Sequence, residues 1–246
     1  FGGLYAHSML LGPFSVLVAL MFLNTYLAHR KRIAMVMFFV AASAVLMSAS
    51  RGATLALALP VVYLFFFMKG VNNGRKKLIG LLVLASIAII PVSDKISSGL
   101  IQKQQLNVKA GSTFNSRESK WNNRIQEFKE NPVFGIGFCS VNPKYSGDYN
   151  SSGGVEAGSS HLSVLSMTGA MGIISYLLVL CSAYLSVFRE KNAVAKMRTC
   201  TFLAMITHAF FEGYALYAGG LLCFVYWLAI GLCADYKKMN NYNLLK

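Results

Sequence analysis

Long apolar runs alternate with short polar segments along the 246 residues of this chain. A helix that crosses a bilayer needs about 20 mostly apolar residues, and such runs recur throughout the sequence. Only residues 94–160 form an extensive hydrophilic segment. The pattern predicts an all-α protein, a polytopic transmembrane helix bundle of about seven spans with one large loop that contains short helices. The predicted spans are residues 8–28, 33–50, 53–68, 78–93, 161–188, 199–215 and 217–234.

Charge along the chain predicts how these spans are oriented. The formal net charge is +14, yet 14 of the 23 basic residues lie in four short polar segments, and residues 94–160 hold eight basic and six acidic residues. The positive-inside rule puts the four basic segments in the cytoplasm and the 94–160 loop outside. The excess charge is therefore an orientation signal and not a nucleic-acid surface. The four segments are residues 29–32, 69–77, 189–198 and the tail from residue 235.

Composition narrows the class of protein further. The chain is 55% hydrophobic and 13% charged, against about 25% charged residues in typical soluble domains. It begins at Phe1 without a signal-peptide pattern, so we expect the C-terminal part of a longer protein. We treat residues 1–246 as one membrane domain that includes the 94–160 loop. The five cysteines form no CxxC pair, which predicts neither a disulfide framework nor a zinc site.

Arg51 is the first candidate for chemistry, because it lies in the apolar stretch "MSASRGATLAL" at residues 47–57. The predicted topology puts it at the outer end of a tight helical hairpin. An arginine there can simply extend its guanidinium into lipid headgroups. The small polar neighbours Ser48, Ser50 and Thr54 favour a second interpretation, since they let helices approach closely around a ligand.

Residues 117–130 predict one helix in the hydrophilic loop, ended by Asn131-Pro132. A spacing of i, i+4, i+7 places Arg117, Trp121 and Arg124 on one narrow stripe. An interfacial helix whose arginines meet lipid phosphates would explain this stripe. The alternative is a cavity at the membrane surface into which both guanidinium groups point.

Two histidines and one glutamate complete the candidates. His161 is predicted at the outer mouth of the helix that follows the loop. His208 and Glu212 are spaced i, i+4 and are expected on one face of one helix. An intramembrane glutamate is a functional candidate, although the pair could equally hold the last helices together.

These residue types suggest one reaction. Guanidinium groups match phosphate oxygens bidentately, and they can stabilise the charge that develops on a diphosphate leaving group. A histidine can take the proton from an incoming hydroxyl. The acidic residues of the loop stand apart, so we expect no metal cofactor. The residues therefore predict glycosyl transfer from a lipid diphosphate at the outer membrane face.

Three segments in order, "SASRGATLAL", "RESKW…NPVFGIGF" and "TGAMGII", resemble the O-antigen ligase and polymerase superfamily, and the similarity covers nearly all of the chain. It implies a bacterial inner-membrane protein whose active site faces the periplasm. It implies metal-independent transfer of a glycan from undecaprenyl diphosphate to lipid A–core. Arg51 matches the family's "SRG" arginine, and Arg117 matches the arginine four residues before the tryptophan. The family's histidine usually stands in an "HN" pair, at the position that Gly158 occupies in this chain. His161 lies three residues after that position.

Two other functions stay open. An O-antigen or exopolysaccharide polymerase would use the same donor with a lipid-linked glycan as acceptor. A transporter or flippase for an anionic lipid-linked solute would favour inverted repeats and broken helices, and the sequence shows no repeat. The predicted partners are the donor, one of these acceptors and membrane lipids.

Overall fold

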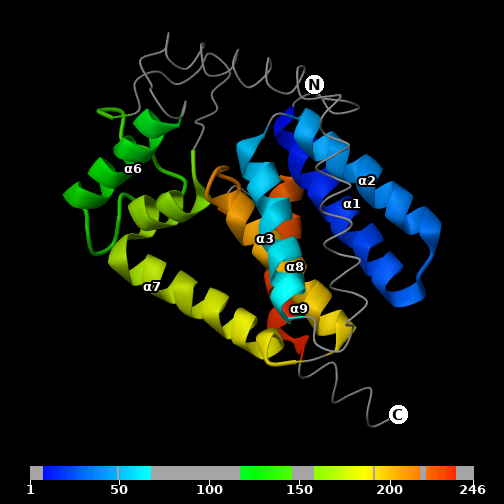
Figure 1. Ribbon diagram of the computed structural model, residues 1–246. Coiled ribbons are helices and arrows are strands. Elements are labelled where there is room, and N and C mark those ends of the chain that lie inside the picture. The colour runs from blue at the N-terminus through cyan, green and yellow to red at the C-terminus, as the bar shows by residue number, and fades with distance from the viewer. Residues whose placement is uncertain are drawn as a thin grey trace. The chain divides into compact units, whose positions relative to one another are not determined.

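The computed structural model describes residues 8–48, 50–67, 117–145, 158–190, 192–216 and 220–236. Within these ranges the protein is all-helical, as predicted (Figure 1). The predicted span 78–93 and much of the 94–160 loop lie outside the described residues. The helices are α1 (Ser8–His29), α2 (Arg32–Met47), α3 (Arg51–Phe67), α6 (Glu118–Glu130), α7 (Ser160–Phe188), α8 (Ala193–Ala209) and α9 (Leu221–Ala234).

Within the described residues, helix length identifies fewer candidate membrane spans than the sequence predicts. In the described part of the chain, Leu10–His29 and Ser160–Phe188 are long and apolar enough to cross a membrane. The apolar helices α2, α3 and α9 are shorter, with 16, 17 and 14 residues. At 1.5 Å per residue, each is shorter than the roughly 30 Å of a bilayer core. The predicted count of about seven spans is therefore not confirmed.

The chain divides into two compact units. The first comprises Phe1–Lys103 with Val187–His208, and it contains α1, α2, α3 and nearly all of α8. The second comprises Gln104–Ser186 with Ala209–Lys246, and it contains α6, most of α7 and α9.

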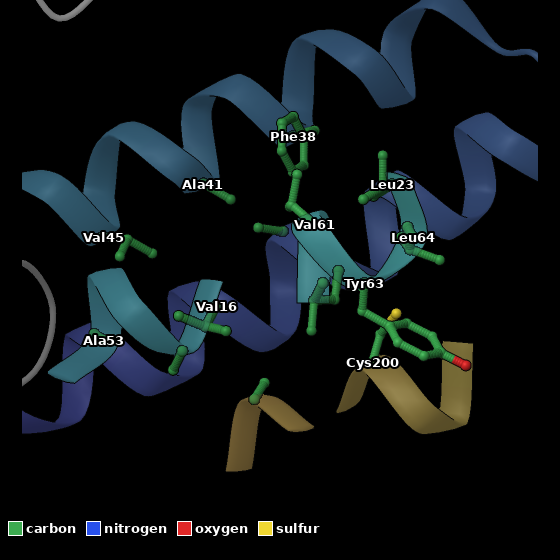
Figure 2. Packing of buried hydrophobic residues seen from close by; sticks show 14 residues of the cluster. Val16, Leu23, Phe38, Ala41, Val45, Ala53, Val61, Tyr63, Leu64 and Cys200 are labelled. Atoms are coloured by element: carbon green, nitrogen blue, oxygen red, sulfur yellow. The ribbon is translucent and has the colours of Figure 1, made fainter. Parts of the chain in front are cut away.

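Apolar side chains from four helices form the core of the first unit (Figure 2). Val16 and Leu23 of α1, Phe38 of α2 and Val61 of α3 are all at most 4% exposed. Small residues allow this packing: a Cβ added at Gly12 of α1 would lie 2.8 Å from the Cβ of Ala53 on α3. The tight α2–α3 hairpin that the sequence predicts is confirmed, because α2 ends at Met47 and α3 begins at Arg51.

Lys196 lies in helix α8, whereas the sequence predicts that residues 189–198 are a polar loop. Asn192 caps α8, its Oδ1 accepting from the amide of Ala195 at 2.8 Å, so the helix begins six residues before the predicted 199. Lys196 is consequently 7% exposed, and its Nζ donates to the Tyr63 hydroxyl at 3.2 Å and the Phe188 carbonyl at 3.1 Å. Aromatic rings around this ammonium group replace part of its hydration.

A sharp bend divides α7 in the second unit, where the sequence predicts one continuous span (Figure 1). Gly169 has φ 63° and ψ −161°, a backbone conformation that is essentially restricted to glycine. Nearby carbonyls and amides therefore lose their helical partners, which is costly in an apolar environment.

Residues 132–137, which follow α6, supply the missing hydrogen bonds. Two amides of this loop donate to α7 carbonyls before the bend, and two of its carbonyls accept from α7 amides after it. The loop therefore satisfies both sides of the broken helix. The pairs are Ile136 N to Ser166 O (3.0 Å), Gly137 N to Met167 O (3.0 Å), Ala170 N to Pro132 O (2.8 Å) and Met171 N to Val133 O (3.3 Å).

The variant Gly169→Ala tests this junction. A Cβ at this position would lie 2.6 Å from the amide nitrogen of Gly135 and would also strain the backbone. We expect destabilisation of about 3 kcal/mol or more, seen as a lower thermal midpoint of the detergent-solubilised protein. Gly231→Ala on α9 is the control, because a Cβ there meets nothing within 4 Å. Equal midpoints for the two variants would contradict the described junction.

Candidate active site

The predicted helix at 117–130 is present as α6, and Arg117 occupies the position just before it. The Arg117 carbonyl accepts from the Trp121 amide at 2.9 Å. After α6, Gly135 and Gly137 have φ values of 71° and 106°, in the left-handed region that favours glycine.

Arg117 lies in a partly shielded network at the start of α7. Its Nη2 donates to Oε1 of Glu212 at 2.5 Å, and these side chains are 11% and 14% exposed. Its Nη1 reaches the Gly158 carbonyl at 3.4 Å, which also accepts from Trp121 Nε1 at 3.1 Å. Gly158 is three residues before His161, so the guanidinium and the imidazole belong to the same end of α7.

Ser160, which the sequence analysis missed, positions Glu212. Its amide and its Oγ both donate to the Glu212 carbonyl, at 3.0 Å and 2.6 Å. The same Oγ accepts from the amides of Tyr214 and Ala215, at 3.0 Å and 3.1 Å. The first residue of α7 thus holds the segment that carries the partner of Arg117. A serine before an apolar helix is so common that its sequence carries little signal of this role.

The prediction that one helix carries both His208 and Glu212 is wrong. α8 ends at Ala209, and the chain turns at Phe210 and Phe211. Glu212 therefore lies outside the helix and forms an ion pair with Arg117. His208 lies in α8 and is 1% exposed.

Arg124 has a different environment from Arg117, although both lie on the predicted stripe. It is 3% exposed, and its Nη1 donates to Glu127 Oε2 at 3.0 Å. The same nitrogen reaches the Ser140 carbonyl and the Ser166 hydroxyl, both at 3.3 Å. Glu127 is only 1% exposed, so this ion pair is buried. Arg124 joins α6, the following loop and α7, and its charge is compensated.

His161 lies in the first turn of α7, as predicted. Its Nδ1 is 2.9 Å from the hydroxyl of Tyr176, which also hydrogen-bonds the hydroxyl of Tyr226 on α9. The ring of Phe210 lies 4.2 Å from the imidazole, centroid to centroid. These contacts orient the imidazole.

Arg51 belongs to the first unit, where it is the first residue of α3 and exposed. Ser50 caps this helix, since its Oγ accepts from the Ala53 amide at 3.3 Å. The Thr54 hydroxyl donates to the Ser50 carbonyl at 3.0 Å. The small polar residues that flank Arg51 thus build the helix terminus that presents it.

A polar cluster holds residues 142–145 against the end of α6. Glu130 accepts hydrogen bonds from the Tyr145 hydroxyl, from Lys144 Nζ at 2.9 Å and from Asn142 Nδ2 at 2.9 Å. The bonds from Tyr145 and Lys144 lower the pKa of Glu130 below its ordinary value. The carboxylate therefore stays charged and keeps this loop beside the site at neutral pH.

A family model for O-antigen ligases matches residues 36–180, which is more than half of the chain. The chain belongs to the O-antigen ligase family. A search of curated proteins gave no match. The matched range includes Arg51, α6 and the bend of α7. The O-antigen ligase family consists of membrane proteins with ligase- or polymerase-type glycosyltransferase activity on lipid-linked glycans. Among the described residues of this family member, no group of three or more His, Cys, Asp or Glu side chains could hold a metal ion.

The variant Arg124→Ala distinguishes a structural arginine from a substrate ligand. Removing it leaves the buried Glu127 carboxylate uncompensated, which costs about 3–5 kcal/mol, so we expect a lower thermal midpoint. The double variant Arg124→Met/Glu127→Leu removes both charges and is expected to regain most of that loss. Lys129→Ala, exposed on the same helix, is the control. A stable Arg124→Ala protein that fails to bind donor would show that Arg124 is a ligand.

Proposed function

We propose that this protein transfers a glycan from undecaprenyl diphosphate to a hydroxyl of lipid A–core at the periplasmic face of the bacterial inner membrane. The observation that carries the proposal is the placement of Arg117 and His161 at one end of α7 in a member of the O-antigen ligase family. A cation for the leaving group and a base for the acceptor are the two groups this reaction needs.

In the proposed reaction His161 removes the proton from the acceptor hydroxyl. The acceptor oxygen forms a bond to the anomeric carbon of the glycan as the bond from that carbon to the diphosphate breaks. The diphosphate leaves with the electron pair, and Arg117 stabilises the negative charge that develops on it. The ion pair with Glu212 holds the guanidinium in place before the donor arrives.

Other residues contribute to donor binding in this proposal. Arg51 is a candidate ligand of the donor phosphates, and the support is the resemblance of its "SRG" motif to the family, whose matched range includes it, and its exposure at the start of α3. Trp121 is a further donor contact beside Arg117, since its indole nitrogen shares the Gly158 carbonyl with the guanidinium.

Analysis of surface polysaccharide in a deletion strain separates the possible acceptors. Naked core with accumulated lipid-linked polymer indicates a ligase, whereas single unpolymerised repeats on core indicate a polymerase. A transporter or flippase would move the donor unchanged. Purified protein in detergent, where there is no membrane to cross, would then form no glycosidic bond between donor and acceptor.

Complementing that strain with Arg51→Ala or Arg117→Ala tests the arginines. Each variant is expected to lower the rate of glycan transfer by about 10²–10³-fold, because it lacks a preorganised guanidinium group that hydrogen-bonds to the diphosphate leaving group. Immunoblots of membrane fractions establish that the variants insert normally. Arg189→Ala, another exposed arginine, is the matched control and keeps transfer. Retained transfer in both site variants would refute the arginine mechanism.

We also propose that the transfer needs no metal, because guanidinium groups supply the charge that a cation would otherwise provide. Purified protein is expected to keep its full rate after dialysis against EDTA. A loss of activity that added magnesium restores would contradict this proposal.

A further inference from the structure

The bend at Gly169 brings two distant residues of α7 together. His161 and Tyr176 are 15 residues apart, and in a straight helix their Cα atoms would be about 22 Å apart. In the bent helix the Tyr176 hydroxyl lies 2.9 Å from Nδ1 of His161. This contact depends on the break, and therefore on the loop of residues 132–137 that fills it.

A second tyrosine holds the first. The hydroxyl of Tyr176 hydrogen-bonds that of Tyr226, and these residues are 7% and 0% exposed. Trp227 packs edge-on against both rings, at centroid distances of 6.4 Å and 5.5 Å. Both phenol groups lie in a closely packed region, where a polar group must have a partner.

The chemistry of a neutral imidazole makes this chain of hydrogen bonds informative. One ring nitrogen carries hydrogen and donates, and the other accepts, so the partner of Nδ1 decides which nitrogen is basic. If Nδ1–H donates to Tyr176, then Nε2 carries the lone pair and can take a proton. The Tyr176 hydroxyl hydrogen is then donated to the oxygen of Tyr226.

We propose that Tyr176, held by Tyr226, is a positioning residue that fixes His161 with Nδ1–H donated to the Tyr176 oxygen and Nε2 as the basic nitrogen. This inference rests on the proposed function, in which His161 is the base. When the acceptor hydroxyl loses its proton, Nε2 gains it, and the glycosyl bond moves from the diphosphate to the acceptor oxygen. The Nδ1 proton stays on the ring throughout, and the tyrosines transfer none.

Tyr176 contacts Nδ1 directly, and the other groups around the imidazole come from the segment after α8 and from α9. The segment after α8 packs Phe210 on the imidazole and carries Glu212, whose charge is compensated by Arg117, just before α6. Tyr214, on the same segment, is 8% exposed, and its amide donates to the Ser160 hydroxyl. The α9 contribution is Tyr226, which acts through Tyr176.

The variant Tyr176→Phe in the full chain, reconstituted in lipid nanodiscs with a lipid-diphosphate glycan donor, tests the inference. Loss of the orienting partner is expected to lower turnover about 10- to 100-fold, with little change in KM for the donor. A phenol oxygen that accepts from Nδ1–H stabilises the imidazolium ion, so its removal lowers the pKa of His161. The acid limb of the pH profile should therefore move to lower pH. Movement to higher pH would show that Tyr176 donates to Nδ1, which overturns the proposal.

Histidine ¹⁵N NMR spectra provide a readout that does not depend on catalysis. The signal of His161 is assigned by its loss in His161→Gln, and it is expected to show the Nδ1–H form in the native protein. Tyr176→Phe should change this signal and its titration, and Tyr226→Phe should do so less. Tyr184→Phe, farther along α7, is the control and leaves the signal and the turnover unchanged.

The outcomes separate the two proposals. If His161→Gln keeps full turnover, His161 is not the base and the proposed function loses its mechanism, while the NMR spectra still decide whether Tyr176 sets the tautomer. If His161→Gln is inactive but Tyr176→Phe changes neither the pH profile nor the spectrum, the positioning inference alone is overturned. A lower thermal midpoint of Tyr176→Phe without those changes also overturns it, because the tyrosine would then be merely structural.

Discussion

Four backbone hydrogen bonds between residues 132–137 and the broken helix α7 are the interaction on which the second unit depends. A helix that breaks in apolar surroundings exposes amides and carbonyls that no water can satisfy. The loop after α6 supplies donors for one side of the break and acceptors for the other. Because it does so, α7 can turn sharply at Gly169 and return His161 to Tyr176.

The same junction explains why two glycine-containing segments are mutually dependent. A Cβ at Gly135 would lie 2.5 Å from the Met167 carbonyl oxygen, and a Cβ at Gly169 would lie 2.6 Å from the Gly135 amide nitrogen. The two backbones meet without side chains between them. Both segments carry the resemblance to the O-antigen ligase family and fall in its matched range. In this protein they are two halves of one structural element that shapes the candidate site.

Tertiary contacts give two arginines of similar sequence context different roles. Arg124 lies deep against α7, and the buried Glu127 carboxylate compensates its charge. Arg117 lies at the start of α6, where Glu212 arrives from a segment 95 residues away in sequence. Both guanidinium groups are therefore paired, but Arg124 is almost fully enclosed, whereas Arg117 keeps an exposed fraction of 11% and, in the proposed function, is the one that meets the diphosphate.

The sequence by itself determined the helical class, the family, the α2–α3 hairpin and the extent of α6, because apolar periodicity, caps and "NP" are local signals. It could not determine that α7 is broken, since Gly169 in an apolar run is equally compatible with close packing of a continuous helix. It also placed Lys196 in a loop and Glu212 in a helix, and it missed Ser160. Only the tertiary structure decided these positions, because their partners lie far away in sequence: Tyr63 for Lys196, Arg117 for Glu212 and the 132–137 loop for Gly169. Long-range hydrogen bonds and ion pairs select one arrangement among several that local propensity permits.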